Sequence, residues 1–248
     1  MSEQPERIGA RAPARVPGDP SRLLDVAALR QFVGAPQAVA VLEGAVERAL
    51  AAGRPLEHVL IAGPDDSGKQ VLARALARDA LQRVVEVDGF WIRDAPHMRR
   101  VLRALDDRDA LLLRHADELR PGAFRMLLSR LGMQGLPREA DRGAPVAACT
   151  LVATITPAPR MPRRLHALRR MCALEVALPH PCDAARAAAA LRAAHALGCP
   201  ATDATRSAVL SRINGQPSSA PIPCMPCWMP GNPADPVEIA RFVANGGC

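Results

Sequence analysis

The apolar positions of the chain follow two alternating patterns, one typical of helices and one typical of buried strands. In residues 35–53 they recur at helical spacing up to Gly53, and residues 58–62 then form a short apolar run. The first pattern predicts an amphipathic helix that Gly53 ends, and the second predicts a buried strand.

The same alternation continues towards the C-terminus. Apolar segments rich in β-branched residues predict strands, and segments with helical spacing predict helices. The predicted strands are 83–89, 109–117 and 149–156, and the predicted helices are 69–81, 95–107 and 122–132. Strands that alternate with such helices are typical of a parallel sheet covered on both faces. The predicted fold class is therefore α/β.

Composition sets the expected domain boundaries. Residues 1–22 are rich in Pro, Arg and Gly without periodicity, which predicts a flexible N-terminal arm. The α/β domain is expected over 23–180, and two further helical stretches predict a partial helical lid over 181–215. Residues 216–248 are dense in proline and cysteine, which predicts an irregular tail.

Composition also narrows the class of protein. No stretch approaches the roughly 18 consecutive apolar residues of a membrane span, and the N-terminus has charges and prolines where a signal peptide is apolar. We therefore expect a cytoplasmic protein outside the membrane. A net charge of +7 permits an acidic partner such as DNA, but the aromatic residues that could stack on bases are only four Phe and two Trp.

The seven cysteines are an odd number, and without an export signal they predict reduced thiols. Cys224 and Cys227 form one C-x-x-C pair. A zinc site would need two more ligands, for which only the distant Cys248 and His180 offer themselves. We therefore predict no metal site.

Residues 63–69 match the spacing of a phosphate-binding loop. Gly63, Gly68 and Lys69 stand in the pattern G-x-x-x-x-G-K between a predicted strand and a predicted helix, which is the context the motif requires. Lys69 is the single lysine among the 32 basic residues, and an ammonium at this position reaches the β- and γ-phosphates of a nucleotide. We predict weak binding of ATP or ADP through this loop.

Three residues depart from the motif. Gln70 stands where a Ser or Thr hydroxyl holds magnesium, and a neutral carboxamide is a poor ligand for a hard cation that demands octahedral geometry. Asp65 and Asp66 lie inside the loop, where their charge repels a triphosphate. We therefore do not expect the site to hold Mg²⁺ well.

Residues 29–69 resemble the opening of RuvB, the AAA+ motor of Holliday junction branch migration, and the likeness keeps its order and spacing over 22–218. It implies a P-loop AAA+ fold, a ring of like or unlike AAA+ subunits, and a role in DNA recombination and repair. It also implies a set of nucleotide-binding positions. These are Arg30, Phe32, Val33, Gly63, Gly68, Lys69 and Gln70.

Residues 109–121 resemble the Walker B strand of that family, but their chemistry differs. The family strand ends in Asp-Glu, for magnesium and for the attacking water, whereas this one ends in Arg114 and His115. A guanidinium cannot ligate a cation, and His115, whose imidazole can act as a base near neutral pH, has no metal carboxylate beside it. Asp117 and Glu118 are interpreted as part of a solvated turn.

Other positions that the resemblance implies are partly retained. The sensor-1 candidates are Thr154 and Thr156, and Ser218 replaces the sensor-2 arginine. The candidates for the arginine finger are Arg164, Arg169 and Arg170. The winged-helix domain of the family has no recognisable counterpart.

Three hypotheses remain open. The favoured one is a nucleotide-binding member of the family that is impaired in hydrolysis, because Lys69 is retained while both Walker B carboxylates are replaced. The second is an active ATP-dependent branch-migration motor whose missing groups come from neighbouring subunits. The third is a decayed paralogue without function.

Overall fold

The computed structural model describes residues 25–131, 148–157, 162–182, 185–186 and 188–189. The predicted arm, the predicted tail with Cys224 and Cys227, and nearly all of the predicted lid lie outside these ranges. Within them, no helix combines the length and the apolar character needed to cross a bilayer.

The core of the fold is a five-stranded sheet in the order β2-β3-β4-β1-β5, in which every neighbouring pair is parallel. Its strands are β1 (Val59–Ala62), β2 (Val84–Asp88), β3 (Ala110–Arg114), β4 (Thr150–Ile155) and β5 (Leu174–Ala177). The first four lie inside ranges predicted as strands from the sequence, whereas β5 is not among the predicted strands. The α/β fold class with a parallel sheet is therefore confirmed.

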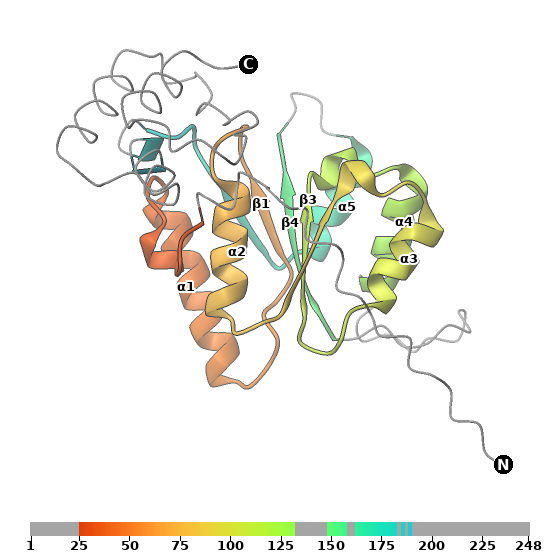
Figure 1. The fold of residues 1–248 in the computed structure, drawn as a ribbon, viewed down its shortest axis with the longest axis horizontal. Coiled ribbons are helices and arrows are strands. Elements are labelled where there is room, and N and C mark those ends of the chain that lie inside the picture. The colour runs from red at the N-terminus through yellow and green to blue at the C-terminus, as the bar shows by residue number, and fades with distance from the viewer. Residues whose placement is uncertain (1–24, 132–147, 158–161, 183–184, 187, 190–248) are drawn as a thin grey trace, which may run out of the picture.

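Helices cover both faces of this sheet (Figure 1). They are α1 (Pro36–Ala51), α2 (Lys69–Asp79), α3 (Ala95–Arg103), α4 (Pro121–Leu131) and α5 (Arg163–Met171). Helices α1 and α2 lie on one side, and α3, α4 and α5 lie on the other (Figure 1). Helix α5 is not among the elements predicted from the sequence.

The side chains of β1 show why the interior strands are apolar throughout. Val59 and Ile61 belong to the hydrophobic cluster under α1 and α2, whereas Leu60 and Ala62 belong to the cluster under α3, α4 and α5. Successive side chains of a strand point to opposite faces, so a sheet covered on both faces requires apolar residues at every position.

The parallel arrangement determines where a site can form. All five strands end at the same edge, and loops that follow the carboxyl ends of such strands are where α/β proteins bind ligands. Here that edge gathers the loop after β1, Asp88 at the end of β2, Arg114 at the end of β3 and Thr156 just after β4.

Candidate nucleotide site

The phosphate-binding loop lies between β1 and α2, as its spacing predicts. Gly68, with φ +84°, is the residue before the first turn of α2, and Asp66 has φ +60°. Aspartate tolerates this left-handed conformation better than most residues do, so the loop accepts Asp66 at a position where the resembling family has glycine. The N–H of Gly63 donates to the Ile155 carbonyl over 3.2 Å and ties the loop to β4.

Lys69 turns its ammonium back against the loop. Its Nζ donates to the carbonyls of Gly63 and Pro64, each at 2.7 Å, and to Oγ1 of Thr156 at 3.3 Å. The residue is only 6% exposed. Burial lowers the pKa of Lys69, although the carboxylates of nearby aspartates act in the opposite direction.

The two carboxylates of the loop are in different environments. Asp65 has an 82% exposed side chain, accepts a hydrogen bond from Thr156 over 3.0 Å and lies 3.8 Å from the Lys69 ammonium. Burial, together with the charge of Asp65, raises the pKa of Asp66 above its ordinary range. Asp65 is thus the loop carboxylate that pairs with the Lys69 ammonium, and it faces the solvent.

Gln70 and Arg114, the two residues that replace magnesium-holding groups of the family, contact each other. Nη1 of Arg114 donates to Oε1 of Gln70 over 3.4 Å, a long hydrogen bond. Nη2 of the same guanidinium lies 3.1 Å from Oδ2 of Asp88, and its Nε lies 3.5 Å from Oε1 of Glu86. The guanidinium thus bridges the start of α2 and the carboxylates of β2.

This donor set does not fit a magnesium ion. The side-chain oxygen of Gln70 already accepts from Arg114, and the guanidinium has no lone pair to offer and carries a positive charge. In the part of the chain that the structure describes, no three His, Cys, Asp or Glu side chains are grouped so that they could hold a metal.

His115 occupies the position of the water-activating glutamate of the family. Its backbone is left-handed, with φ +47°, and its N–H donates to Oγ1 of Thr154 over 3.3 Å. Nδ1 lies 3.1 Å from Oδ2 of Asp88. The hydrogen bond with Asp88 raises the pKa of His115, which favours the imidazolium over the neutral form that a general base requires.

Asp117 was missed as a site residue by sequence reasoning. It lies in the 3₁₀ helix Ala116–Glu118, half-buried, and one oxygen of its carboxylate has no hydrogen-bond partner among the residues described. The charge of Asp117 is among the causes that raise the pKa values of Lys69 and His115, so the carboxylate acts on the same edge of the sheet. The predicted solvated turn therefore fits the exposed Glu118 but not Asp117.

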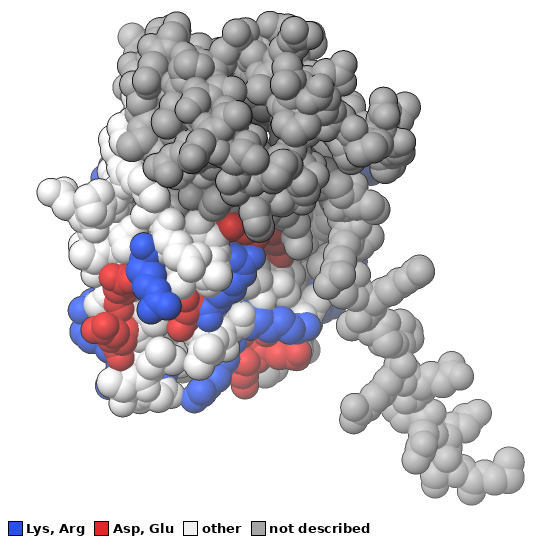
Figure 2. All heavy atoms as spheres, turned by 60° about the vertical axis from the view of Figure 1, so that its left-hand side comes forward, with Lys and Arg blue, Asp and Glu red and all other residues white. Residues whose placement is uncertain are grey.

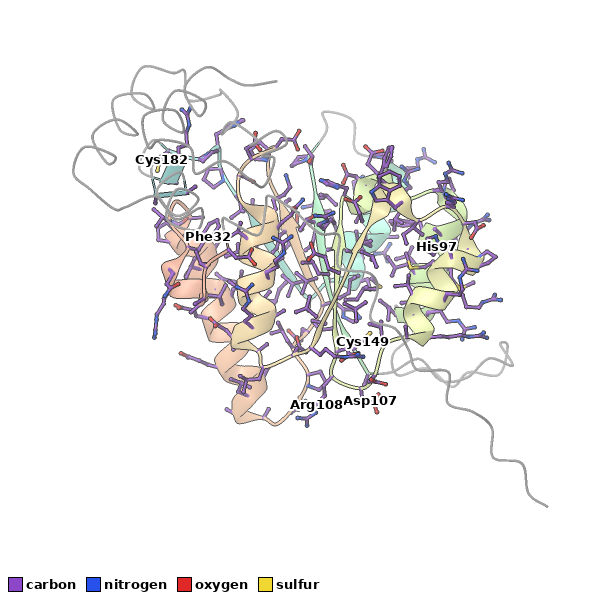
Figure 3. The ribbon with its side chains drawn as sticks, in the orientation of Figure 1. Phe32, His97, Asp107, Arg108, Cys149 and Cys182 are labelled. Atoms are coloured by element: carbon purple, nitrogen blue, oxygen red, sulfur yellow. The ribbon has the colours of Figure 1, made fainter. Side chains whose placement is uncertain are left out.

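The predicted adenine-pocket segment contacts the loop through Phe32. A Cβ placed on Gly68 would lie 2.9 Å from Cε2 of the Phe32 ring. Arg30 is exposed and Val33 is 43% exposed. Figure 3 shows Phe32 on the side of the sheet that carries α1 and α2.

Ion pairs with α2 hold this segment in place. Asp25 pairs with Arg74 at 3.0 Å and with Arg78 at 2.6 Å, and the N–H of Leu29 donates to Oδ2 of Asp79 over 2.9 Å. The sequence gives little sign of these contacts because they join residues that lie far apart along the chain. They explain why Phe32 reaches the loop.

The three candidates for the arginine finger differ in what they contact. Arg164 donates to the Asp117 carbonyl over 2.9 Å, and Arg169 pairs with Glu175 at 2.8 Å. Arg170 is exposed and makes no hydrogen bond or ion pair with another described residue. The choice of an arginine finger among these three stays a prediction.

Known proteins share both the sequence and the fold of this chain. The family model of the Holliday junction DNA helicase RuvB P-loop domain matches residues 24–132. The Holliday junction branch migration complex subunit RuvB of Koribacter versatilis (strain Ellin345) is 27% identical over 162 residues, which are 62% of this chain and 45% of that protein. The protein of the same name from Methanoregula boonei is 30% identical over 111 residues, 44% of this chain and 33% of that protein.

A solved structure agrees with these relatives. The RuvB Holliday junction branch migration motor of Thermotoga maritima superposes with a TM-score of 0.63 at 23% identity, over 77% of this chain and 60% of that one. The matches thus span between a third and three fifths of the length of these proteins. The chain is therefore similar in sequence to the RuvB P-loop domain over residues 24–132, and it shares the fold of the Thermotoga maritima motor.

Proposed function

We propose that this chain is a nucleotide-binding member of the RuvB-like AAA+ proteins whose ATP hydrolysis is impaired. The observation that carries the proposal is the pair of residues at the end of β3. Arg114 points its guanidinium at Gln70, and His115 pairs with Asp88, at the two positions where a hydrolytic site needs carboxylates. ATP or ADP is the proposed ligand, and Mg²⁺ is not required.

Binding is supported by the loop itself. The Lys69 ammonium contacts two loop carbonyls and Thr156, and an incoming phosphate can replace these oxygens as its partner. The Phe32 ring lies against Gly68, and the Lys69 ammonium contacts the Gly63 carbonyl, which supports the proposed nucleotide site. The retained groups are those that bind phosphate and base.

Hydrolysis depends on the groups that are replaced. Phosphoryl transfer relies on a metal to neutralise charge and on a carboxylate to orient water, and each contributes several kcal/mol of transition-state stabilisation. Each loss of about 1.4 kcal/mol lowers the rate roughly tenfold. We therefore expect ATP turnover to be close to the uncatalysed background.

Calorimetric titration of ATP and ADP into the purified protein tests the proposal, with Lys69→Ala as the variant and Arg83→Met as the matched control. Arg83 pairs with Asp106 at 2.9 Å near the amino end of β2, away from the loop. Binding that Lys69→Ala removes and Arg83→Met keeps supports a working P-loop. Equal behaviour of the folded wild type and Lys69→Ala refutes it.

An active motor is a second candidate, and Asp117 is the observation that favours it. Its half-buried carboxylate, whose charge acts on Lys69 and His115, could orient water from a position after the strand, in place of the missing glutamate. Magnesium-dependent ATP turnover that Asp117→Asn abolishes would establish this function. Exposed Glu118→Gln is the matched control.

Partners follow from the family and are proposals for this chain. We propose assembly with like or unlike AAA+ subunits in a ring, action on DNA in recombination and repair, and a cytoplasmic location. On the face shown in Figure 2, basic and acidic side chains are interspersed. Such a surface favours contacts between subunits over a continuous DNA-binding stripe on that face.

A further inference from the structure

The contact between Arg114 and Gln70 carries an inference that rests on the proposed nucleotide binding and deepens it. We propose that the Arg114 guanidinium takes the place of the magnesium ion, so that the site binds a nucleoside di- or triphosphate that is not chelated to a divalent cation. The ligand class is thus the free nucleotide anion, in place of its metal complex.

The position of the guanidinium supports this assignment. Gln70 follows Lys69 directly at the start of α2, and Arg114 reaches the side chain of Gln70 from the end of β3 over 3.4 Å. The guanidinium therefore lies beside the residue whose family counterpart holds the metal, on the same edge of the sheet as the Lys69 ammonium. The inference requires that a phosphate held by Lys69 also reach Arg114.

The charge of the guanidinium acts on both the phosphates and a metal. In the resembling family a carboxylate supports a divalent cation next to the phosphates. Here the guanidinium supplies a positive charge at the end of the same strand, which Asp88 at 3.1 Å and Glu86 at 3.5 Å partly offset. Arg114 attracts a phosphate and repels a metal bound to the nucleotide.

The chemistry of the two side chains also suits a phosphate. A guanidinium presents its N–H groups in a planar fork that matches phosphate oxygens, whereas an ammonium acts as a point charge. With its oxygen turned to Arg114, the carboxamide of Gln70 has its NH₂ group as a donor. Lys69, Gln70 and Arg114 thus offer three side-chain donors and no metal ligand.

Carboxylates of β2 fix the direction of the guanidinium. Asp88 lies 3.1 Å from Nη2 and Glu86 lies 3.5 Å from Nε, and the Arg114 side chain is 20% exposed. Glu86 is itself held by Arg74 at 2.7 Å. An oriented, half-buried guanidinium loses less conformational entropy when it binds an anion than a mobile surface arginine does.

The test is calorimetric titration of ATP and ADP into the full chain, once in EDTA and once in excess magnesium. We expect the wild type to bind at least as tightly in EDTA as in magnesium. Arg114→Met should weaken binding in EDTA by at least tenfold, whereas Arg114→Lys, which keeps the charge but not the fork, should weaken it less. Arg83→Met is the matched control, because Arg83 also pairs with carboxylates beside β2 but lies near its other end.

A double variant, Gln70→Thr with Arg114→Asp, tests the inference by gain of function. It restores a hydroxyl and a carboxylate at the two positions, so its binding should become dependent on magnesium. The inference would be overturned if the wild type bound nucleotide only in magnesium. If Lys69→Ala still abolished that binding, the proposed function would remain intact. No Lys69-dependent binding in either buffer would overturn both. If Arg114→Met does not fold, the wild-type comparison in the two buffers decides.

Discussion

The ring of Phe32 lies so close to Gly68 that a Cβ on the glycine would come within 2.9 Å of ring atom Cε2. Gly68 also has φ +84°, a conformation that costs a residue with a side chain roughly 1–2 kcal/mol. The last glycine of the loop is thus required by its backbone and by its neighbour together. This contact joins the predicted adenine-pocket segment to the predicted phosphate site.

We predict that Gly68→Ala lowers the free energy of unfolding by more than Gly53→Ala does. Gly53 has φ +60°, but a Cβ there meets nothing within 4 Å, so its substitution costs only the backbone strain, about 1 kcal/mol. The excess at Gly68 measures the contact with Phe32. Urea unfolding of both variants checks this order. In a Phe32→Ala background, the two substitutions should lower the free energy of unfolding by equal amounts. An excess that persists there would contradict the role of the ring.

A second prediction concerns two arginines of α2 that share a partner. Arg74 is 4% exposed and pairs with both Glu86 and Asp25, whereas the Arg78 side chain is 43% exposed and pairs with Asp25. Removing one partner of a buried ion pair costs about 3–5 kcal/mol, and removing one of an exposed pair costs up to about 1 kcal/mol. Arg74→Met should therefore destabilise the fold by several times as much as Arg78→Met.

Denaturant midpoints of these two variants check that order. The same comparison should show whether the segment around Phe32 depends on α2, because Asp25 is the residue through which both arginines hold it. Nucleotide affinity should then fall in Arg74→Met in parallel with stability. Equal costs for the two variants would mean that burial of Arg74 contributes little.

The strands could be predicted because the sheet is covered on both faces. β1, β3 and β4 are buried along almost their whole length, and this produces uninterrupted apolar runs that only a strand or a buried helix can accommodate. Helix α5 could not be found in the same way. Its buried residues are only Leu165 and Leu168, and the arginines around them conceal the helical spacing.

The site could be predicted only in part, for a similar reason. The spacing of Gly63, Gly68 and Lys69 is local, so the sequence carries it directly. The contact of Arg114 with Gln70 spans 44 residues and depends on how β3 lies beside the start of α2. Both substitutions were visible in the sequence, but their pairing required the sheet order. The burial of Asp117 likewise depends on a 3₁₀ turn that no spacing predicts.

A third prediction concerns the reactivity of the cysteines. Cys149 and Cys172 are buried, and desolvation raises their pKa values to about 11 and about 12, whereas Cys182 is exposed. The thiolate is the reactive form, and at a pKa of about 11 only about one thiol in a thousand is ionised near pH 8. Among these three cysteines, iodoacetamide at that pH should therefore modify Cys182 first, and the two buried thiols only when urea is added.

Mass spectrometry of the peptides that contain Cys149, Cys172 and Cys182 gives the labelling rate of each of these three thiols separately. The order of labelling should be the same at every concentration of the reagent, because burial limits both the access to the thiols and their ionisation. Fast labelling of Cys149 without urea would show that the end of the sheet around β4 opens readily. Figure 3 places Cys149 near Asp107 and Arg108, far from Cys182.

The last prediction is that His58 and His115 give stability opposite dependences on pH. His115 pairs with Asp88, which raises its pKa above the ordinary value of about 6.5. The folded state therefore binds the proton more tightly than the unfolded chain does. The stability that His115 contributes is fully present below that ordinary pKa and is lost as the pH rises through the higher folded pKa.

For His58 the sign is reversed. Burial lowers its pKa, and its Nδ1 accepts a hydrogen bond from the Leu151 N–H over 3.0 Å, which requires the neutral ring. Its contribution is present above the ordinary pKa and falls as the pH drops from there towards the lower folded pKa. The free energy of unfolding should therefore be measured in urea between about pH 5 and pH 9. His58→Gln should reduce the loss of stability in acid, whereas His115→Gln should reduce the loss of stability above neutral pH. In an Asp88→Asn background, His115→Gln should no longer reduce the loss of stability above neutral pH, because Asp88 is the main cause of the raised pKa.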